Sequence, residues 1–93
     1  MLFMIAGYLK PDAEEQLINF RTEFNEHFAQ APLVAAGVLR GEDGKRRGYL
    51  GFVEADGIDG ARRFVHESPY FQEGFYDHVE IFEYDVEVGA IGA

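Results

Sequence analysis

Few side chains in this sequence could transfer a proton near neutral pH, and His27 is the first candidate. It follows Phe20 by seven residues, so in a helix the two side chains would share roughly one face, two turns apart. An imidazole can act as a general acid or base when a carboxylate orients it. Glu23, four residues earlier, could be that carboxylate or could form an ordinary helix pair. His27 is therefore the catalytic candidate, and a structural or solvent-edge histidine is the alternative.

Arg21 and Ser68 have the chemistry to hold a ligand. Arg21 flanks the same helical stripe, where its guanidinium could bind a ligand carboxylate through two hydrogen bonds or pair with a neighbouring glutamate. Ser68 precedes Pro69, which favours an extended backbone and could turn the hydroxyl toward a ligand. No Gly-x-Ser-x-Gly motif surrounds Ser68, so we expect hydrogen bonding there rather than nucleophilic catalysis.

Aromatic side chains accompany these polar residues. Four of them follow Ser68 closely: Tyr70, Phe71, Phe75 and Tyr76. Such a cluster offers stacking area and hydroxyl groups to a planar small molecule, and core or dimer packing is the alternative. The predicted ligand-binding residues are Phe20, Arg21, Phe24, Ser68 and Tyr70.

Metal and nucleotide sites are not expected. His66 and His78 are separated by a turn, and the sequence has no His-x-x-x-His pair. Gly57-x-x-Gly60 opens a predicted helix but lacks the rest of a nucleotide-binding fingerprint. We therefore predict no metal and no cofactor.

Charge and composition limit the partners and the location. Seventeen acidic residues against eight basic ones give a net charge of −9, which repels nucleic-acid phosphates and anionic lipids, so neither nucleic acid nor a membrane is an expected partner. The chain has no cysteine and therefore no disulfide framework. Its apolar opening lacks a basic start and stops at Lys10, too short for a signal or a membrane span. We expect a cytoplasmic protein.

The first half of the chain is expected to form a strand, a helix and a strand hairpin. Residues 2–9 are apolar on both alternating sets, which is typical of a strand covered on both faces. Apolar residues three or four apart predict an amphipathic helix over residues 12–30, closed by Pro32. A second strand that is apolar on both sides covers residues 33–39. A polar turn at 41–45 and a return strand at 46–55 complete the hairpin.

The second half is expected to add one helix and one strand. Asp56 and Asp59 suit the start of a short helix that Pro69 ends, residues 75–88 alternate as a partly exposed strand, and residues 89–93 form a loose tail. The order predicts a single ferredoxin-like α+β domain over residues 1–93, with two helices on one face of an antiparallel sheet. The other face is apolar too, so a second copy is expected to cover it, giving a homodimeric α+β barrel.

Two short motifs and their order carry a resemblance to a known family. Ala36-Gly37-Val38-Leu39 ends the second strand, and Ser68-Pro69-Tyr70 precedes the segment from Gly74 to Val79. These motifs, with the glycine-bearing hairpin between them, resemble the YCII-related family of small dimeric α/β barrel proteins over nearly the whole chain. The family commonly has an Ala-Gly-Pro-Leu type stretch at the first place and Asp-Pro-Tyr at the second.

The resemblance implies an acid/base pair formed by a histidine of the first helix and the aspartate of the second motif. The aspartate position holds Ser68. Counted back from Gly37 without gaps, the histidine position holds Phe20, and a gapped alignment brings His27 there instead. The resemblance therefore implies that this pair is not retained.

Three functions remain open at this level. We favour a dimer with a small-molecule cleft that acts in ligand binding or as an accessory module. The resemblance implies the second, an isomerase, lyase or dehydrochlorinase-like enzyme that acts on an aromatic or lactone substrate through His27, Tyr70 and Arg21. The third is a structural homodimer with no ligand. The surroundings of His27 and the size of the cleft distinguish these alternatives.

Overall fold

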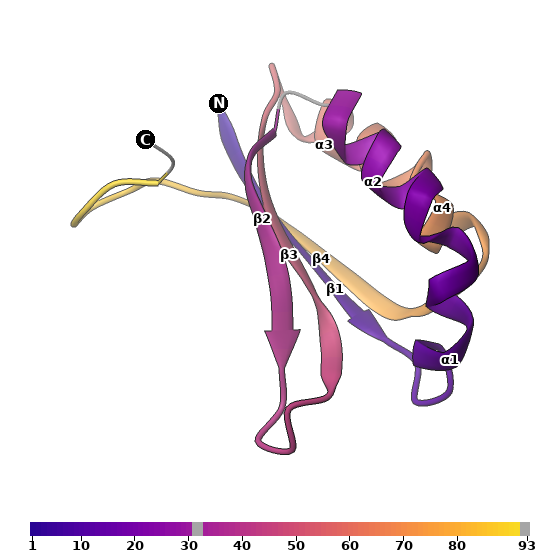
Figure 1. Cartoon of the computed structure of the whole chain (residues 1–93). Coiled ribbons are helices and arrows are strands. Elements are labelled where there is room, and N and C mark those ends of the chain that lie inside the picture. Colours follow the sequence, from indigo (N-terminus) through magenta and orange to yellow (C-terminus); the bar gives the residue numbers. More distant parts are fainter. Residues whose placement is uncertain (31–32, 92–93) are drawn as a thin grey trace.

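The computed structural model describes residues 1–30 and 33–91 and contains one four-stranded sheet with helices on one side (Figure 1). In chain order the elements are β1 (Leu2–Leu9), α1 (Glu14–Leu17), a 3₁₀ helix η1 (Ile18–Phe20), α2 (Arg21–Gln30), β2 (Leu33–Arg40), β3 (Arg46–Glu54), α3 (Ile58–His66), α4 (Pro69–Gln72) and β4 (Tyr76–Glu83). All strand pairs are antiparallel and the sheet order is β2-β3-β1-β4. This arrangement confirms the predicted ferredoxin-like α+β fold.

The main core lies between the sheet and α3. Phe3 and Ile5 of β1 and Val53 of β3 point to the helix side, where they pack against Ala61 and Val65 of α3. Side chains of a strand alternate between faces, so this contact also fixes which residues of β1 face the other way. A second core joins the remaining helices to the end of the sheet and consists of Ala13, Leu17, Phe24, Tyr70 and Phe75.

The sheet face opposite the helices carries large apolar side chains. Met4 pairs across the strands with Phe52 on one side and with Phe82 on the other, so all three lie on this face. Phe82 is 55% exposed, and Tyr84 packs edge-to-face on Phe52 with ring centres 5.1 Å apart. No other element in the described part of the chain covers this face (Figure 1). We call it the bare face.

The predicted helices differ from the observed ones in two places. The helix expected over residues 12–30 begins at Glu14, and the 3₁₀ helix η1 divides it into α1 and α2. The second helix ends at His66, and Pro69 starts a further short helix, α4, instead of only ending the previous one. Proline is favoured in a first helical turn because that position needs no N–H donor, so one residue both stops α3 and begins α4.

The last strand is shorter than predicted. β4 ends at Glu83 rather than at residue 88. It pairs with β1 alone, Phe3 lies opposite Glu83, and the N–H of Tyr84 donates to the carbonyl of Leu2 at 2.9 Å, so β1 offers no further partner. The predicted helix end at Pro32 and residues 92–93 of the predicted tail lie outside the described residues. Each helix in the described part is too short or too polar to cross a bilayer.

A glycine substitution tests the close approach of β1 and β3. A Cβ added at Gly48 would collide with the backbone carbonyl of Gly7, whereas a Cβ at Gly37 would meet nothing within 4 Å. Backbone cannot move aside without breaking the pairing, so Gly48→Ala should lower the free energy of unfolding by about 1–3 kcal/mol. Gly37→Ala, the matched control in the same sheet, should leave it unchanged or slightly higher. Urea denaturation of both variants measures the difference, and equal stabilities would contradict the register.

Candidate functional site

A cleft of about 440 Å³ opens between α2 and the strands β2 and β3. The side chains from α2 that line it are Arg21, Phe24, Asn25, Phe28 and Ala29. The sheet contributes Ala36, Gly37, Val38, Arg46 and Tyr49, and α4 contributes Tyr70. The helix layer packs mainly over the other strands, which leaves this side of β2 open. A hollow of this size is in the range of small-molecule sites.

Two arginines from different elements meet at the cleft. Arg21 begins α2 and Arg46 begins β3, and both also line an adjoining hollow of about 180 Å³. Arg46 Nη1 donates a hydrogen bond to the Tyr49 hydroxyl at 3.1 Å. Among the described residues, neither guanidinium forms an ion pair, and no aspartate or glutamate lines the cleft. The lining of the cleft is therefore positively charged, although the chain as a whole has a net charge of −9.

Stacked aromatic rings form the wall beneath these cations. Tyr70 is 1% exposed and lies flat on Phe24, with ring centres 3.8 Å apart and planes 9° apart. Tyr49 contacts both rings, at 5.2 Å from Phe24 and 5.5 Å from Tyr70. Burial raises the pKa of Tyr70, Tyr49 raises it further, and Arg21 and Arg46 oppose part of that increase. The Tyr70 side chain is thus a buried group with two cations nearby.

His27 points to α3 rather than into the cleft. Its Nε2 donates to the backbone carbonyl of Phe64 at 2.9 Å, and its ring stacks on the Phe64 ring at 4.5 Å. His27 is not among the described residues that line the cleft. No hydrogen bond from its ring to Ser68 or to a carboxylate occurs among the described residues. The imidazole joins α2 to α3.

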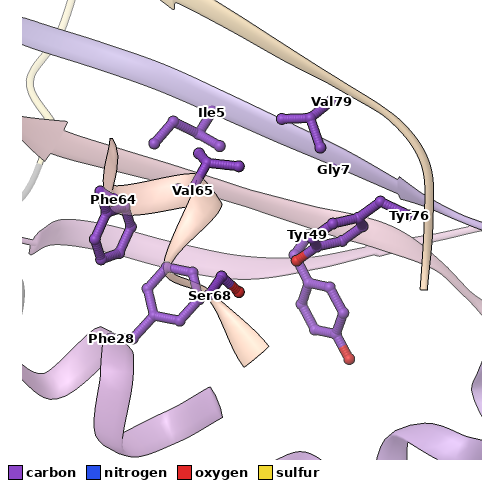
Figure 2. A pocket seen from close by; sticks show the side chains of 10 residues that line it. Ile5, Gly7, Phe28, Tyr49, Phe64, Val65, Ser68, Tyr76 and Val79 are labelled. Carbon is purple, nitrogen blue, oxygen red and sulfur yellow. The ribbon is translucent and has the colours of Figure 1, made fainter. Parts of the chain in front are cut away.

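Ser68 lies in a separate, much smaller cavity of about 20 Å³ beside the cleft (Figure 2). It is 4% exposed, and its Oγ makes no hydrogen bond within 3.5 Å. Figure 2 shows its hydroxyl turned toward the hydroxyl of Tyr76. Burial raises the pKa of Tyr76, Tyr49 and Tyr70 raise it further, and the nearby Ser68 hydroxyl offsets a little of that rise. Phe28 and Tyr49 line both hollows, so they form the partition between them.

The structure brings together three of the residues predicted to bind a ligand. Arg21, Phe24 and Tyr70 line the cleft. Phe20 instead packs edge-to-face on Phe75 with ring centres 5.5 Å apart, and Ser68 lines the small separate cavity.

Arg46 and Tyr49 are among the residues of the cleft that were not predicted from the sequence as ligand-binding. Simple strand alternation puts residues three apart on opposite faces. The pairing of β2 with β3 shifts register between Leu39 and Arg40, and one extra residue of β3 brings Arg46 to the face of Tyr49. The signal available in the sequence was the run of basic residues at 45–47, which the hairpin turn presents next to the first helix.

The described residues contain no group of three histidine, aspartate or glutamate side chains that could hold a metal ion. The cleft is instead lined by two guanidinium groups, those of Arg21 and Arg46, and by an aromatic wall that includes two tyrosines. This combination suits a flat molecule that carries negative charge.

Solved structures with the same architecture include an enzyme complex. The 5-chloro-2-hydroxyhydroquinone dehydrochlorinase TftG from Burkholderia phenoliruptrix AC1100, in complex with 2,5-dihydroxybenzoquinone, matches with a TM-score of 0.83 at 18% identity, over 91% of this chain and 94% of that one. Rv0793 from Mycobacterium tuberculosis matches with a TM-score of 0.55 at 11% identity over 95% and 97% of the two chains. An antibiotic biosynthesis monooxygenase matches with 0.55 at 16% identity over 95% and 100%. These similarities establish the fold.

The family follows from the sequence itself. No curated protein sequence matches the chain. The sequence model of the YCII-related domain matches residues 1–85, which include every helix and strand from β1 to β4. The chain therefore belongs to the YCII-related domain family.

Proposed function

We propose that this protein binds a small, planar organic anion in the cleft between α2 and the strands β2 and β3. The observation that carries the proposal is the convergence of Arg21 and Arg46 on a cleft that no described carboxylate lines, in a chain with seventeen acidic residues. Guanidinium groups bind carboxylates and similar oxyanions through charge-assisted hydrogen bonds. The negative group of the ligand would lie between these two side chains.

The flat part of the ligand would pack against the aromatic wall. The buried stack of Phe24 and Tyr70 supports the half-buried rings of Phe28 and Tyr49, and a planar ring gains buried area and ring contacts against those two. The Tyr49 hydroxyl accepts a hydrogen bond from Arg46 and can donate its own proton to a ring oxygen of the ligand. Candidate ligands are aromatic carboxylates and acidic hydroxyquinones. The hydroxyquinone bound to TftG belongs to the second class.

The position of His27 favours ligand binding over acid/base chemistry by that residue. Its Nε2–H is used by the Phe64 carbonyl, and its ring is stacked on Phe64 away from the lining of the cleft. An acid/base catalyst must reach the proton that it transfers. We assign His27 to the contact between α2 and α3, and we assign ligand binding to the arginines and tyrosines that line the cleft.

We also infer that two copies of the chain pair through their bare faces. Phe82 and Tyr84, at 55% and 37% exposure, lie beside Phe52 on that face. Large apolar patches left in water favour association, and a self-complementary sheet face is suited to a two-fold dimer. The bare face lies opposite the helices that form the cleft, so pairing there leaves the cleft accessible (Figure 1).

Removal of either arginine tests the ligand site. With 2,5-dihydroxybenzoquinone as the probe, Arg21→Gln and Arg46→Gln should each raise Kd by about tenfold or more, because a hydrogen bond to a charged group contributes about 1.5–3 kcal/mol. Arg62→Gln, on the surface of α3 beside Asp59, is the matched control and should bind as the unmodified chain does. Isothermal titration calorimetry measures each Kd. The neutral analogue 2,5-dimethoxybenzoquinone should bind weakly to all variants, and equal binding of both quinones would contradict an anion site.

Replacement of His27 separates its two possible roles. His27→Phe keeps a ring against Phe64 but removes the hydrogen bond to the Phe64 carbonyl, so the free energy of unfolding should fall by about 0.5–1.5 kcal/mol. The Kd for 2,5-dihydroxybenzoquinone should stay within twofold of the unmodified value. Loss of binding without loss of stability would instead place His27 in the binding site.

Sedimentation velocity at micromolar concentration tests the pairing of copies. The unmodified 10.5 kDa chain should sediment as a dimer. Phe82→Glu should shift it to the monomer, because a charge would be buried in the apolar contact. Phe71→Glu is the control, since Phe71 is 38% exposed on α4, on the helix side of the sheet. A monomeric unmodified chain would rule out the pairing.

A further inference from the structure

Six of the eight basic residues gather at one end of the molecule. This end carries the β2–β3 hairpin and the turn after β1, whereas the other two basic residues, Arg62 and Arg63, lie on α3 at the opposite end (Figure 1). The six are Lys10, Arg21, Arg40, Lys45, Arg46 and Arg47. We call this region the basic end. It contrasts with the net charge of −9 for the whole chain.

The basic end contains a pocket that is distinct from the cleft. Its volume is about 190 Å³, and the residues that line it are Leu9, Lys10, Pro11, Asp12, Glu15, Lys45, Arg46 and Arg47. Arg46 lines both this pocket and the cleft. The two hollows therefore adjoin the same residue, which places them close enough for one molecule to contact both.

The charges in this pocket are only partly compensated. Arg47 pairs with Asp43 at 2.7 Å, and the N–H of Lys45 donates to the other oxygen of that carboxylate at 3.0 Å. These contacts hold the pKa of Asp43 below its usual value and fix the hairpin. The ammonium groups of Lys10 and Lys45 form no ion pair with any carboxylate that the structure describes.

Two carboxylates, Asp12 and Glu15, also line the pocket. Both are exposed, whereas the lining includes four basic residues, so the balance remains positive. Lysine binds phosphate as a point charge, and an arginine such as Arg46 adds directional hydrogen bonds.

We propose that this pocket binds a second anionic group, a phosphate or a carboxylate, carried by the molecule whose planar part lies in the cleft. The inference rests on the proposed function, because it assigns the cleft to the planar part of the same ligand. It narrows the ligand to planar acids with an additional phosphate or carboxylate on a short chain. Arg46 contacts both parts of that ligand.

A titration with inorganic phosphate tests the pocket without the cleft. Followed by amide chemical shifts at constant ionic strength of about 0.15 M with chloride as the reference anion, phosphate should shift Lys10, Lys45 and Arg46 and leave Arg62 and Arg63 unchanged. The double variant Lys10→Gln/Lys45→Gln should weaken phosphate binding by about tenfold. Arg62→Gln/Arg63→Gln removes the same charge elsewhere and should bind phosphate normally. Equal phosphate binding by both double variants, or no binding by the unmodified chain, overturns the inference.

Further arms identify the anion and separate this inference from the proposed function. A titration with malonate in place of phosphate shows which of the two anions has the lower Kd. Either preference supports the pocket, provided that the preferred anion shifts the amide signals of Lys10 and Lys45. Lys10→Gln/Lys45→Gln should keep the Kd for 2,5-dihydroxybenzoquinone within twofold, and Arg21→Gln should keep that for phosphate. Saturating phosphate should leave quinone binding in place. If phosphate displaces the quinone, the two anions share one site, and the inference of a second site at the basic end is overturned. If the unmodified chain binds phosphate but not the quinone, the result counts against the proposed function and not against the pocket.

Discussion

The stack of Tyr70 on Phe24 is the contact on which the candidate site depends. Tyr70 is 1% exposed and touches Phe24 of α2, Tyr49 of β3 and Phe75 at the start of the last strand segment. One ring thus joins two helices to the sheet. Arg21 lies one helical turn before Phe24, so the same stack sets where its guanidinium stands over β3. The height of α2 above β2, and with it the opening of the cleft, follows from this packing.

The distribution of charge over the chain acts on a ligand at longer range than the packing of Tyr70 on Phe24 does. The chain carries more than twice as many acidic as basic residues, yet the described lining of the cleft has two cations and no carboxylate. The rest of the surface repels small anions, and the basic end attracts them. Fields of this kind raise the rate at which a charged ligand meets its site and are screened by salt. The negative net charge, which disfavours nucleic acid as a partner, is therefore compatible with the proposed binding of a small anion.

The sequence predicts the fold well because hydrophobic periodicity reports burial directly. β1, apolar on both alternating sets, and the helical spacing up to Phe28 were enough to order the elements. The missed details depend on contacts that no local pattern records. α4 begins at the proline expected only to end a helix, β4 stops where its partner β1 begins, and Arg46 changes face through a register shift of one residue. The basic run at 45–47 was visible in the sequence, but the register shift that places Arg46 on the cleft side of the sheet was not.

Residue type alone was a weaker guide to chemistry than location. His27 donates to a backbone carbonyl and Ser68 is buried beside a small separate cavity, so both of these side chains lie in the packing around the cleft. The described residues that line the cleft include no carboxylate and no imidazole to accept a proton, and burial raises the pKa of Tyr70, which makes ionisation of that hydroxyl still less favourable. Two guanidinium groups beside aromatic rings would stabilise a negative charge that a ligand already carries. The geometry is accordingly better suited to hold an anion than to create one by removing a proton.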